Sequence, residues 1–291
     1  MKQDLLIAHI TDIHYPLMTA FKLEDIFSKR VTGAFNLFFN RHRRFRSYLL
    51  KESLAHIRRL ECDYLLVTGD ISNLGYLEEF EAVKNDLQAS GFSPENTCVV
   101  PGNHDVYTKT SFLQENFWKG MGDYSHCSGP EHYPVRTRID NIEIIGLSSA
   151  VPSPPGMAWG KLGRQQLDRL ETILSEKSLF RRVIIIHHPP CAGPDSWDDG
   201  LIDAADLRAV LWNHKIEVVL HGHEHFDMSS FIDGEMGGRI PVLGTGCAIL
   251  DNYERPGNGA RIRFLRFVDG SFQRTWVAQW SPDTGHFKNV E

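Results

Sequence analysis

Short apolar runs rich in valine, isoleucine and leucine recur along most of the chain. Runs of this length and composition are typical of strands that are buried on both faces. They predict strands at Leu5–Ile10, Tyr64–Thr68, Thr97–Val100, Ile142–Leu147, Val183–Ile186 and Glu217–Leu220. Segments with helical periodicity lie between them, at Ser47–Leu60, Tyr76–Ser90, Arg164–Glu176 and Asp203–His214. Strands that alternate with helices predict an α/β fold.

The last third of the chain has a different pattern, in which strands follow one another. Strands are predicted at Met228–Ile232, Arg239–Leu243, Arg261–Val268 and Phe272–Trp280. The turn signals Asp233-Gly234 and Asp269-Gly270 separate two pairs of them. Because no repeat, low-complexity tract or flexible linker divides the sequence, we expect residues 1–291 to form one domain.

Composition and charge exclude several classes of protein. The chain has 291 residues, of which 42% are hydrophobic and 23% charged, so a disordered, collagen-like or coiled-coil protein is excluded. The net charge of -6 argues against a general nucleic-acid binder. The five cysteines are widely spaced and indicate neither a disulfide framework nor a thiolate zinc site. Since no run is long enough to span a membrane and no secretory signal is present, we expect a cytoplasmic protein.

Polar residues capable of binding metal follow the carboxyl ends of the apolar runs. They occur in the segments Asp12-Ile13-His14, Gly69-Asp70, Gly102-Asn103-His104-Asp105, His187-His188-Pro189-Pro190 and Gly222-His223-Glu224-His225. In open α/β sheets the ligand crevice lies outside the carboxyl ends of the strands. These segments are therefore expected to converge on one site. His9 and His221 lie inside strand-like runs and are expected to be core histidines.

In this order and from about Leu5 to about Ala248, the motifs resemble those of the calcineurin-like metallophosphoesterases. The resemblance implies two packed mixed β-sheets flanked by helices, an α/β/β/α sandwich. The strand-rich C-terminal third is expected to supply the second sheet. It also implies a hydrolase of phosphoester bonds.

The family pattern implies two divalent metal ions that share the carboxylate of Asp70. One ion would be held by Asp12, His14, Asp70 and His225. The other would be held by Asp70, Asn103, His187 and His223. Carboxylate, amide and imidazole donors without thiolate suit Mn²⁺, Fe or Zn²⁺, and we expect Mn²⁺.

The resemblance further implies that a metal-bridging hydroxide attacks phosphorus in line. His104 would face the substrate and protonate the leaving oxygen or stabilise the transition state. Two roles stay open for Asp105: it fixes the tautomer of His104, or it caps a helix. The His-x-Pro pattern selects His187 as a ligand, which leaves His188 to contact the substrate or to support a ligand.

The segment Phe21–Arg46 is basic and aromatic. It contains six phenylalanines and seven cationic residues against two acidic ones. Three interpretations stay open: a helical insertion packed on the core, a peripheral membrane or acyl-chain contact, and a nucleotide or polyphosphate contact. Lys29 and Arg30 are candidates for binding a diphosphate.

The substrate is not fixed by these patterns. The insertion favours hydrolysis of a phosphodiester or pyrophosphate bond in a nucleotide-linked lipid such as UDP-2,3-diacylglucosamine at a membrane surface. The run from His187 to Pro190, followed by Asp203–Leu211, resembles instead the branch that cleaves 3′,5′-cyclic nucleotides in the cytosol. A non-catalytic scaffold of the same fold is a third hypothesis, and the complete ligand set argues against it.

Overall fold

The computed structural model describes residues 4–17, 45–106, 108–154, 156–191, 199–251 and 259–290. Of the predicted insertion at 21–46, only Phe45 and Arg46 belong to these ranges. Lys29 and Arg30 lie outside the described residues.

Two six-stranded sheets form the centre of the molecule. The first has the order β12-β11-β10-β1-β2-β3, and β1, β2 and β3 are parallel. Its strands are β1 (Asp4–Ile10), β2 (Tyr64–Val67), β3 (Thr97–Val99), β10 (Arg261–Val268), β11 (Ser271–Ser281) and β12 (His286–Val290). The β10 strand pairs antiparallel with β1, so the sheet is mixed.

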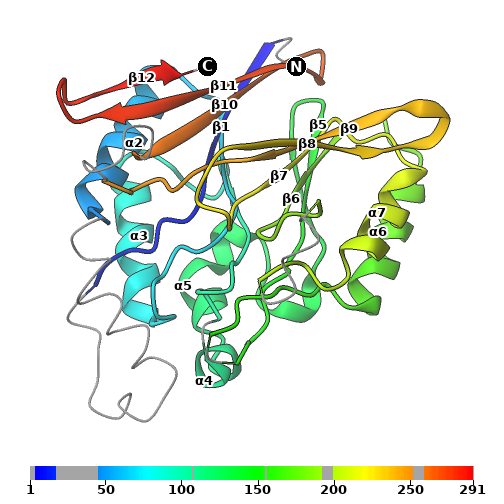
Figure 1. Cartoon of the computed structure of the whole chain (residues 1–291), viewed down its shortest axis with the longest axis horizontal. Helices are drawn as coiled ribbons and strands as arrows, with labels where there is room; N and C mark the ends of the chain where they lie inside the picture. The colour runs from blue at the N-terminus through cyan, green and yellow to red at the C-terminus, as the bar shows by residue number, and fades with distance from the viewer. Residues whose placement is uncertain are drawn as a thin grey trace.

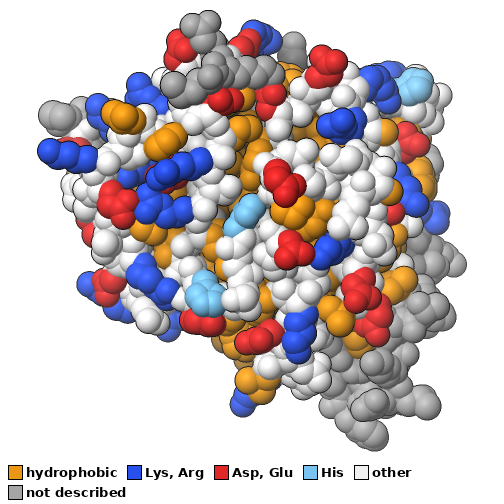
Figure 2. Space-filling view, turned by 180° about the vertical axis from the view of Figure 1, so that it is seen from behind, with side chains coloured by type: hydrophobic (Ala, Val, Ile, Leu, Met, Phe, Trp, Pro, Cys, Tyr) orange, Lys and Arg blue, Asp and Glu red, His pale blue; other side chains and the backbone are white. Residues whose placement is uncertain are grey.

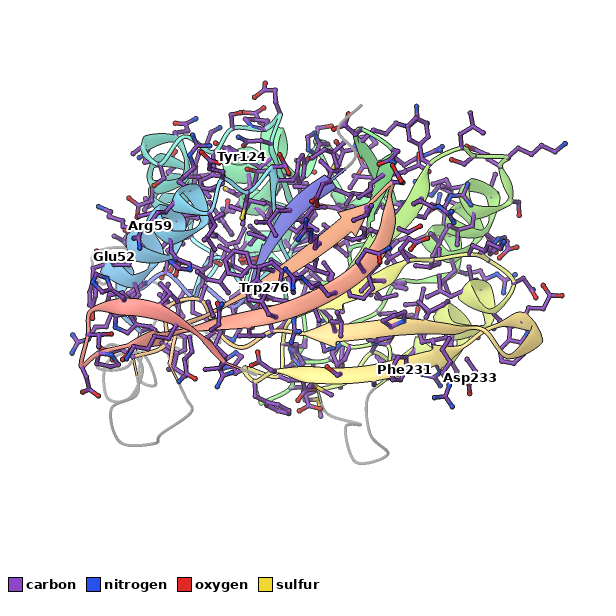
Figure 3. All side chains as sticks on the ribbon, turned by 90° about the horizontal axis from the view of Figure 1, so that it is seen from above. Glu52, Arg59, Tyr124, Phe231, Asp233 and Trp276 are labelled. Atoms are coloured by element: carbon purple, nitrogen blue, oxygen red, sulfur yellow. The ribbon has the colours of Figure 1, made fainter. Side chains whose placement is uncertain are left out.

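The second sheet has the order β4-β5-β6-β7-β9-β8 and is also mixed. Its strands are β4 (Val135–Ile139), β5 (Ile142–Gly146), β6 (Arg181–Ile185), β7 (Val218–His221), β8 (Met228–Asp233) and β9 (Arg239–Gly244). The inner strands run parallel, whereas β4 and β8 pair antiparallel at the two edges. In Figure 3, Trp276 marks β11 of the first sheet, and Phe231 and Asp233 mark β8 of the second.

Helices cover the outer faces of the two sheets. They are α2 (Ser47–Arg59), α3 (Leu77–Ala89), α4 (Lys109–Leu113), α5 (Asn116–Ser125), α6 (Arg164–Ser175) and α7 (Ala204–Trp212), with short 3-10 turns at Pro130–His132 and Glu235–Gly237. Figure 1 shows α2 and α3 on one side and α6 and α7 on the other, with both sheets between them. The predicted α/β/β/α sandwich is confirmed.

Alternation along the strands of the second sheet separates two cores. Val218 and Leu220 of β7 belong to the large core that also contains Ile7 of β1. Val219, between them, belongs to a smaller core under α6 and α7. The β7 strand is therefore apolar on both faces, which explains its continuous apolar run.

We expected the C-terminal third to supply the second sheet, and this expectation was wrong. Its strands are divided between the sheets: β8 and β9 join the second, and β10, β11 and β12 join the first. The first sheet gains them because β10 pairs with β1, at the opposite end of the sequence. Local apolar patterns indicate a strand but carry no information about its partner. The expectation of a single domain over 1–291 stays a prediction.

The sequence patterns also missed four elements, which are β4, β12, α4 and α5. The β4 strand lies at a sheet edge, and its Arg136 and Arg138 pair with the buried Glu143 of β5. Such a strand lacks the apolar run that marks the inner ones. Within the described part of the chain, no helix combines the length and apolarity needed to cross a membrane.

Packing between the sheets gives a first prediction. We expect Leu220→Ala to lower the free energy of unfolding by about 2–5 kcal/mol, because it leaves a cavity between the sheets. Leu179 is 99% exposed and provides the matched control. Leu179→Ala is expected to change that free energy by less than about 0.5 kcal/mol in the same urea titration. Similar small effects for both variants would contradict the inter-sheet position of Leu220.

Candidate metal centre

Loops at the carboxyl ends of strands from both sheets meet at one place. After β1, the backbone N–H groups of Asp12 and His14 donate to the carbonyl oxygens of Gly69 and Asp70, at 3.1 and 2.8 Å. His223, after β7, donates its backbone N–H to Oδ2 of Asp12 at 3.0 Å. The predicted convergence of the polar segments is therefore observed.

The backbone of these loops is held in an unusual conformation. Five residues of the predicted ligand set have a positive φ: Asp12 (52°), His14 (42°), Asp70 (51°), His223 (75°) and His225 (60°). Residues other than glycine rarely adopt the left-handed region, and each such residue costs about 1–3 kcal/mol. Surrounding contacts must hold the loops in place, as is common at functional sites.

Two glycines allow the loops to approach each other. A Cβ atom on Gly102 would fall on Oδ1 of Asp70, and one on Gly222 would fall on Oγ1 of Thr11. Glycine is the one residue that fits so close to a neighbouring chain. The glycines of the motifs are therefore needed for packing the loops around Asp70 and Asp12.

One cluster of donor atoms is formed by Asp12, His14, Asp70 and His225. Nε2 of His14 lies 3.0 Å from Nε2 of His225, which lies 3.2 Å from Oδ1 of Asp12. Oδ2 of Asp70 lies 3.5 Å from Nε2 of His14. These four side chains therefore direct their donor atoms towards one point.

A second cluster lies on the other side of Asp70. Oδ1 of Asn103 is 3.1 Å from both Nε2 of His187 and Nδ1 of His223. Oδ1 of Asp70 lies 3.5 Å from Nε2 of His187. The two oxygens of Asp70 thus face different clusters.

The distances and the donor types fit two metal ions. Ligand atoms about 2.1 Å from one ion, at angles of about 90–110°, lie about 3.0–3.4 Å from each other. The separations within both clusters are close to these values. All donors are carboxylate or amide oxygen and imidazole nitrogen, which are ligands for borderline and harder divalent ions.

The electrostatics of the site also favour cations. Burial raises the pKa of Asp70 well above its usual range, and the charges of Asp12 and Asp105 raise it further. Burial lowers the pKa of His187 to about 3, which keeps this imidazole neutral as a metal ligand must be. Neighbouring buried carboxylates repel each other, and divalent cations would relieve that repulsion.

His104 lies beside the site and is partly exposed. Its backbone N–H donates to Oδ1 of Asp70 at 2.8 Å, and its ring lies 4.6 Å from the ring of His14. Nδ1 lies 2.7 Å from the carbonyl oxygen of Asn73. Because a carbonyl accepts hydrogen bonds and donates none, Nδ1 carries the hydrogen in the neutral ring. In that tautomer Nε2 carries no hydrogen.

Asp105 has neither of the roles predicted for it. The carbonyl of Asn73, not the carboxylate of Asp105, contacts Nδ1 of His104, and α4 is capped by Thr108. Asp105 instead accepts from the backbone N–H groups of Ser72 and Gly102, both at 2.8 Å. Its carboxylate joins the loops that follow β2 and β3.

His188 lies buried beside the second cluster. It is fully buried, and its ring centre lies 4.4 Å from that of His223. Nδ1 contacts the hydroxyl of Ser149 and Nε2 the carbonyl of Ala158, both at 2.8 Å. Both ring nitrogens are thus hydrogen-bonded to protein groups, which favours support of a ligand over contact with the substrate, and both roles stay predictions.

The sequence did not indicate the backbone groups that contact the histidines of the site. The carbonyl of Asn73 is a backbone atom, so no residue type could have indicated it. His187 is held in the same way, because its Nδ1 lies 2.7 Å from the carbonyl of Thr68. His9 is a core histidine as predicted, with ring nitrogens 2.8 and 2.9 Å from the hydroxyls of Thr68 and Thr245.

Comparison with curated proteins finds relatives of one kind. The chain is 27% identical over 181 residues to a probable cyclic nucleotide phosphodiesterase of Vesicomyosocius okutanii, covering 60% of this chain and 68% of that protein. It is 29% identical over 177 residues to a 3′,5′-cyclic adenosine monophosphate phosphodiesterase of Vibrio vulnificus, covering 59% and 58%.

Solved structures share the fold at low sequence identity. A dimetal phosphatase from Danio rerio matches with a TM-score of 0.61 and 17% identity, covering 94% of this chain and 95% of that one. A purple acid phosphatase from yellow lupin matches with a TM-score of 0.63 and 11% identity, covering 99% and 53%. These matches support the two-sheet architecture.

A sequence model of one family matches residues 5–227, which include every motif of the site. The matched region and the two donor clusters together indicate a binuclear site for divalent metal ions. The chain therefore belongs to the calcineurin-like phosphoesterase family, and it is a metal-dependent phosphoesterase.

Proposed function

We propose that the protein hydrolyses the phosphodiester bond of 3′,5′-cyclic nucleotides with the help of two divalent metal ions. The observation that carries the metal chemistry is the position of Asp70, whose two oxygens face different clusters. The choice of substrate is supported by the relatives, which are named as cyclic nucleotide phosphodiesterases.

The proposed ligand sets follow the two clusters. One ion would be held by Asp12, His14, Asp70 and His225. The other would be held by Asp70, Asn103, His187 and His223. The separation of about 3.5–4 Å that a shared carboxylate allows is the one used for in-line displacement at phosphorus. Mn²⁺ stays our prediction for the native metal.

The ions would supply charge neutralisation at the phosphoryl oxygens and an activated water molecule. The chain itself would supply the proton for the leaving oxygen, from Nε2 of His104 in its imidazolium form, which leaves a neutral ring with its hydrogen on Nδ1. The Asn73 carbonyl holds the other nitrogen of that ring. The backbone N–H of His104 also holds Asp70, so the acid and the shared ligand keep a fixed relation to each other.

The other hypotheses have less support. The nucleotide-linked lipid and the membrane contact were predicted from residues 21–46, most of which lie outside the described residues. On the face shown in Figure 2, cationic and anionic side chains are interspersed, as suits a small-molecule enzyme better than a nucleic-acid binder. A non-catalytic scaffold would not need the seven clustered donor side chains.

A direct competition tests the substrate. The Mn²⁺-loaded protein receives 3′,5′-cyclic AMP and UDP-2,3-diacylglucosamine together in detergent, and phosphorus NMR follows the products. We expect AMP to appear first. Earlier release of UMP and lipid phosphate would contradict the proposal, and so would the absence of both reactions.

Removal of the shared carboxylate tests the ligand assignment. We expect Asp70→Ala to bind fewer than two ions per chain and to lose nearly all turnover, because both clusters lose a ligand. Metal content is measured by mass spectrometry after gel filtration. Asp123→Ala is the control, since the Asp123 side chain is 71% exposed. Two retained ions with full turnover in Asp70→Ala would contradict the assignment.

Substitution of His104 separates proton transfer from metal binding. We expect His104→Ala to keep both ions and to reduce kcat by about 100-fold or more for diesters with poor leaving groups. The loss should be much smaller with p-nitrophenolate, which leaves without a proton. His132→Ala, at a half-exposed side chain, serves as the control. A fall in metal content of His104→Ala would show that His104 is a ligand.

A further inference from the structure

The segment between β2 and α3, residues 72–76, contacts the ring of His104, the proposed acid. The Asn73 carbonyl lies 2.7 Å from Nδ1 of His104. Its direction depends on the backbone of this segment, not on the Asn73 side chain. Whatever holds the segment therefore determines how the His104 ring is held.

Glu79, in the first turn of α3, binds this segment directly. Its side chain is fully buried, and it accepts hydrogen bonds from three backbone N–H groups. The donors are Asn73 at 3.2 Å, Leu74 at 3.0 Å and Tyr76 at 3.1 Å. One carboxylate thus accepts from the peptides on both sides of Asn73.

These contacts exceed ordinary helix capping. A glutamate at this helical position commonly reaches back to the N–H of the capping residue alone, which is Tyr76 here. Glu79 continues along the chain to Leu74 and Asn73, towards His104. Two of its three donors therefore belong to the segment that contacts the acid and not to the helix.

Burying a carboxylate at position 79 costs free energy, because the charged form loses its hydration. Burial raises the pKa of Glu79 to about 7, whereas the three backbone donors act to lower it. An apolar side chain would avoid the burial of a charge, but it would leave three N–H groups without their acceptor. Stability of α3 alone does not require such an arrangement.

The start of the segment is fixed by other groups. Ser72 donates its backbone N–H to Asp105, and its hydroxyl lies 3.1 Å from the carbonyl oxygen of His104. Asn116 donates to the carbonyl of Gly75 at 2.9 Å. Ser72 and Gly75 thus have partners other than Glu79, whereas the N–H groups of Asn73 and Leu74 donate to Glu79.

We propose that Glu79 is a positioning residue for His104: through the Asn73 carbonyl it orients the ring, so that the imidazolium gives its Nε2 proton to the leaving oxygen and remains as the neutral Nδ1–H tautomer. The inference rests on the proposed function, because the proton transfer by His104 is part of it. Glu79 touches neither substrate nor metal and acts through the backbone of residues 73 and 74.

The kinetic consequence is specific. Loss of Glu79 should affect kcat for diesters with poor leaving groups and leave KM and metal content unchanged. Outer groups that orient a functional histidine are worth about 10- to 100-fold in activity. We expect a loss of that size for Glu79→Ala with a methyl phenyl phosphodiester, and a small loss with a p-nitrophenyl ester.

The experiment compares Glu79→Ala, Glu79→Gln and the matched control Glu78→Gln, at the exposed neighbouring position. Glu79→Gln keeps the side-chain volume and one acceptor oxygen, so it is expected to fold and to lose less activity than Glu79→Ala. Metal content, Tm, kcat and KM are measured for both esters. An equal loss with both esters, a raised KM or a lost ion would overturn the proposal.

A double-mutant cycle adds a stricter test. If Glu79 acts through His104, then Glu79→Gln should reduce kcat by less than about twofold in a His104→Ala background, since coupled residues are not additive. An undiminished further loss would overturn the inference, because it would show that Glu79 supports the fold in general.

A spectroscopic readout separates this inference from the proposed function. In ¹⁵N NMR, the signals of the His104 ring are assigned by their disappearance from the spectrum of His104→Ala. We expect them to show the Nδ1–H tautomer in the parent protein and a mixture of tautomers in Glu79→Gln. An unchanged tautomer would overturn the role of Glu79 even if the protein is active. A parent protein without phosphodiesterase activity but with the expected tautomer shift would contradict the proposed function alone.

Discussion

The structure of the site depends on one buried carboxylate, that of Asp70, which lies between the two clusters of donor atoms and contacts both. Asp70 directs one oxygen to His14 and the other to His187, and it also accepts the backbone N–H of His104. A charged group that is fully buried is tolerated only where its neighbours compensate it. The neighbouring loops therefore have to bring imidazoles, an N–H donor and space for cations to this one residue.

The two-sheet architecture meets this requirement. Parallel strands of both sheets end at the same edge, so loops from opposite halves of the sandwich face each other there. Short backbone contacts then lock the loops together, and Gly102 allows the chain to pass directly beside Asp70. The strain of left-handed residues such as Asp12 and His225 is carried by this surrounding framework.

The segments that carry the clustered donor side chains were predictable from the sequence, because their polar residues follow the apolar runs directly; the assignment of ligands came from the family resemblance and stays a prediction. The supporting contacts were not predictable, since they depend on rotamers and on backbone atoms. Asp105 and the Asn73 carbonyl illustrate the difference: Asp105, beside His104 in sequence, accepts from the backbone of Gly102, and a carbonyl 31 residues away in sequence contacts Nδ1 of His104. For the same reason β10 was recognised as a strand but assigned to the wrong sheet, because its pairing with β1 is non-local.

The span of the site along the chain has a consequence for folding. Asp12 and His223, whose contact closes the site, are 211 residues apart in sequence. Contacts between residues so far apart in sequence are expected to form late in folding. Closing so long a loop costs conformational entropy, which the packing of the two hydrophobic cores must first offset. Any metal ion that binds the completed site, and not the unfolded chain, would stabilise the native state by mass action. The bound ions would then stabilise the contact between the N-terminal segment that contains Asp12 and the distant segment that contains His223.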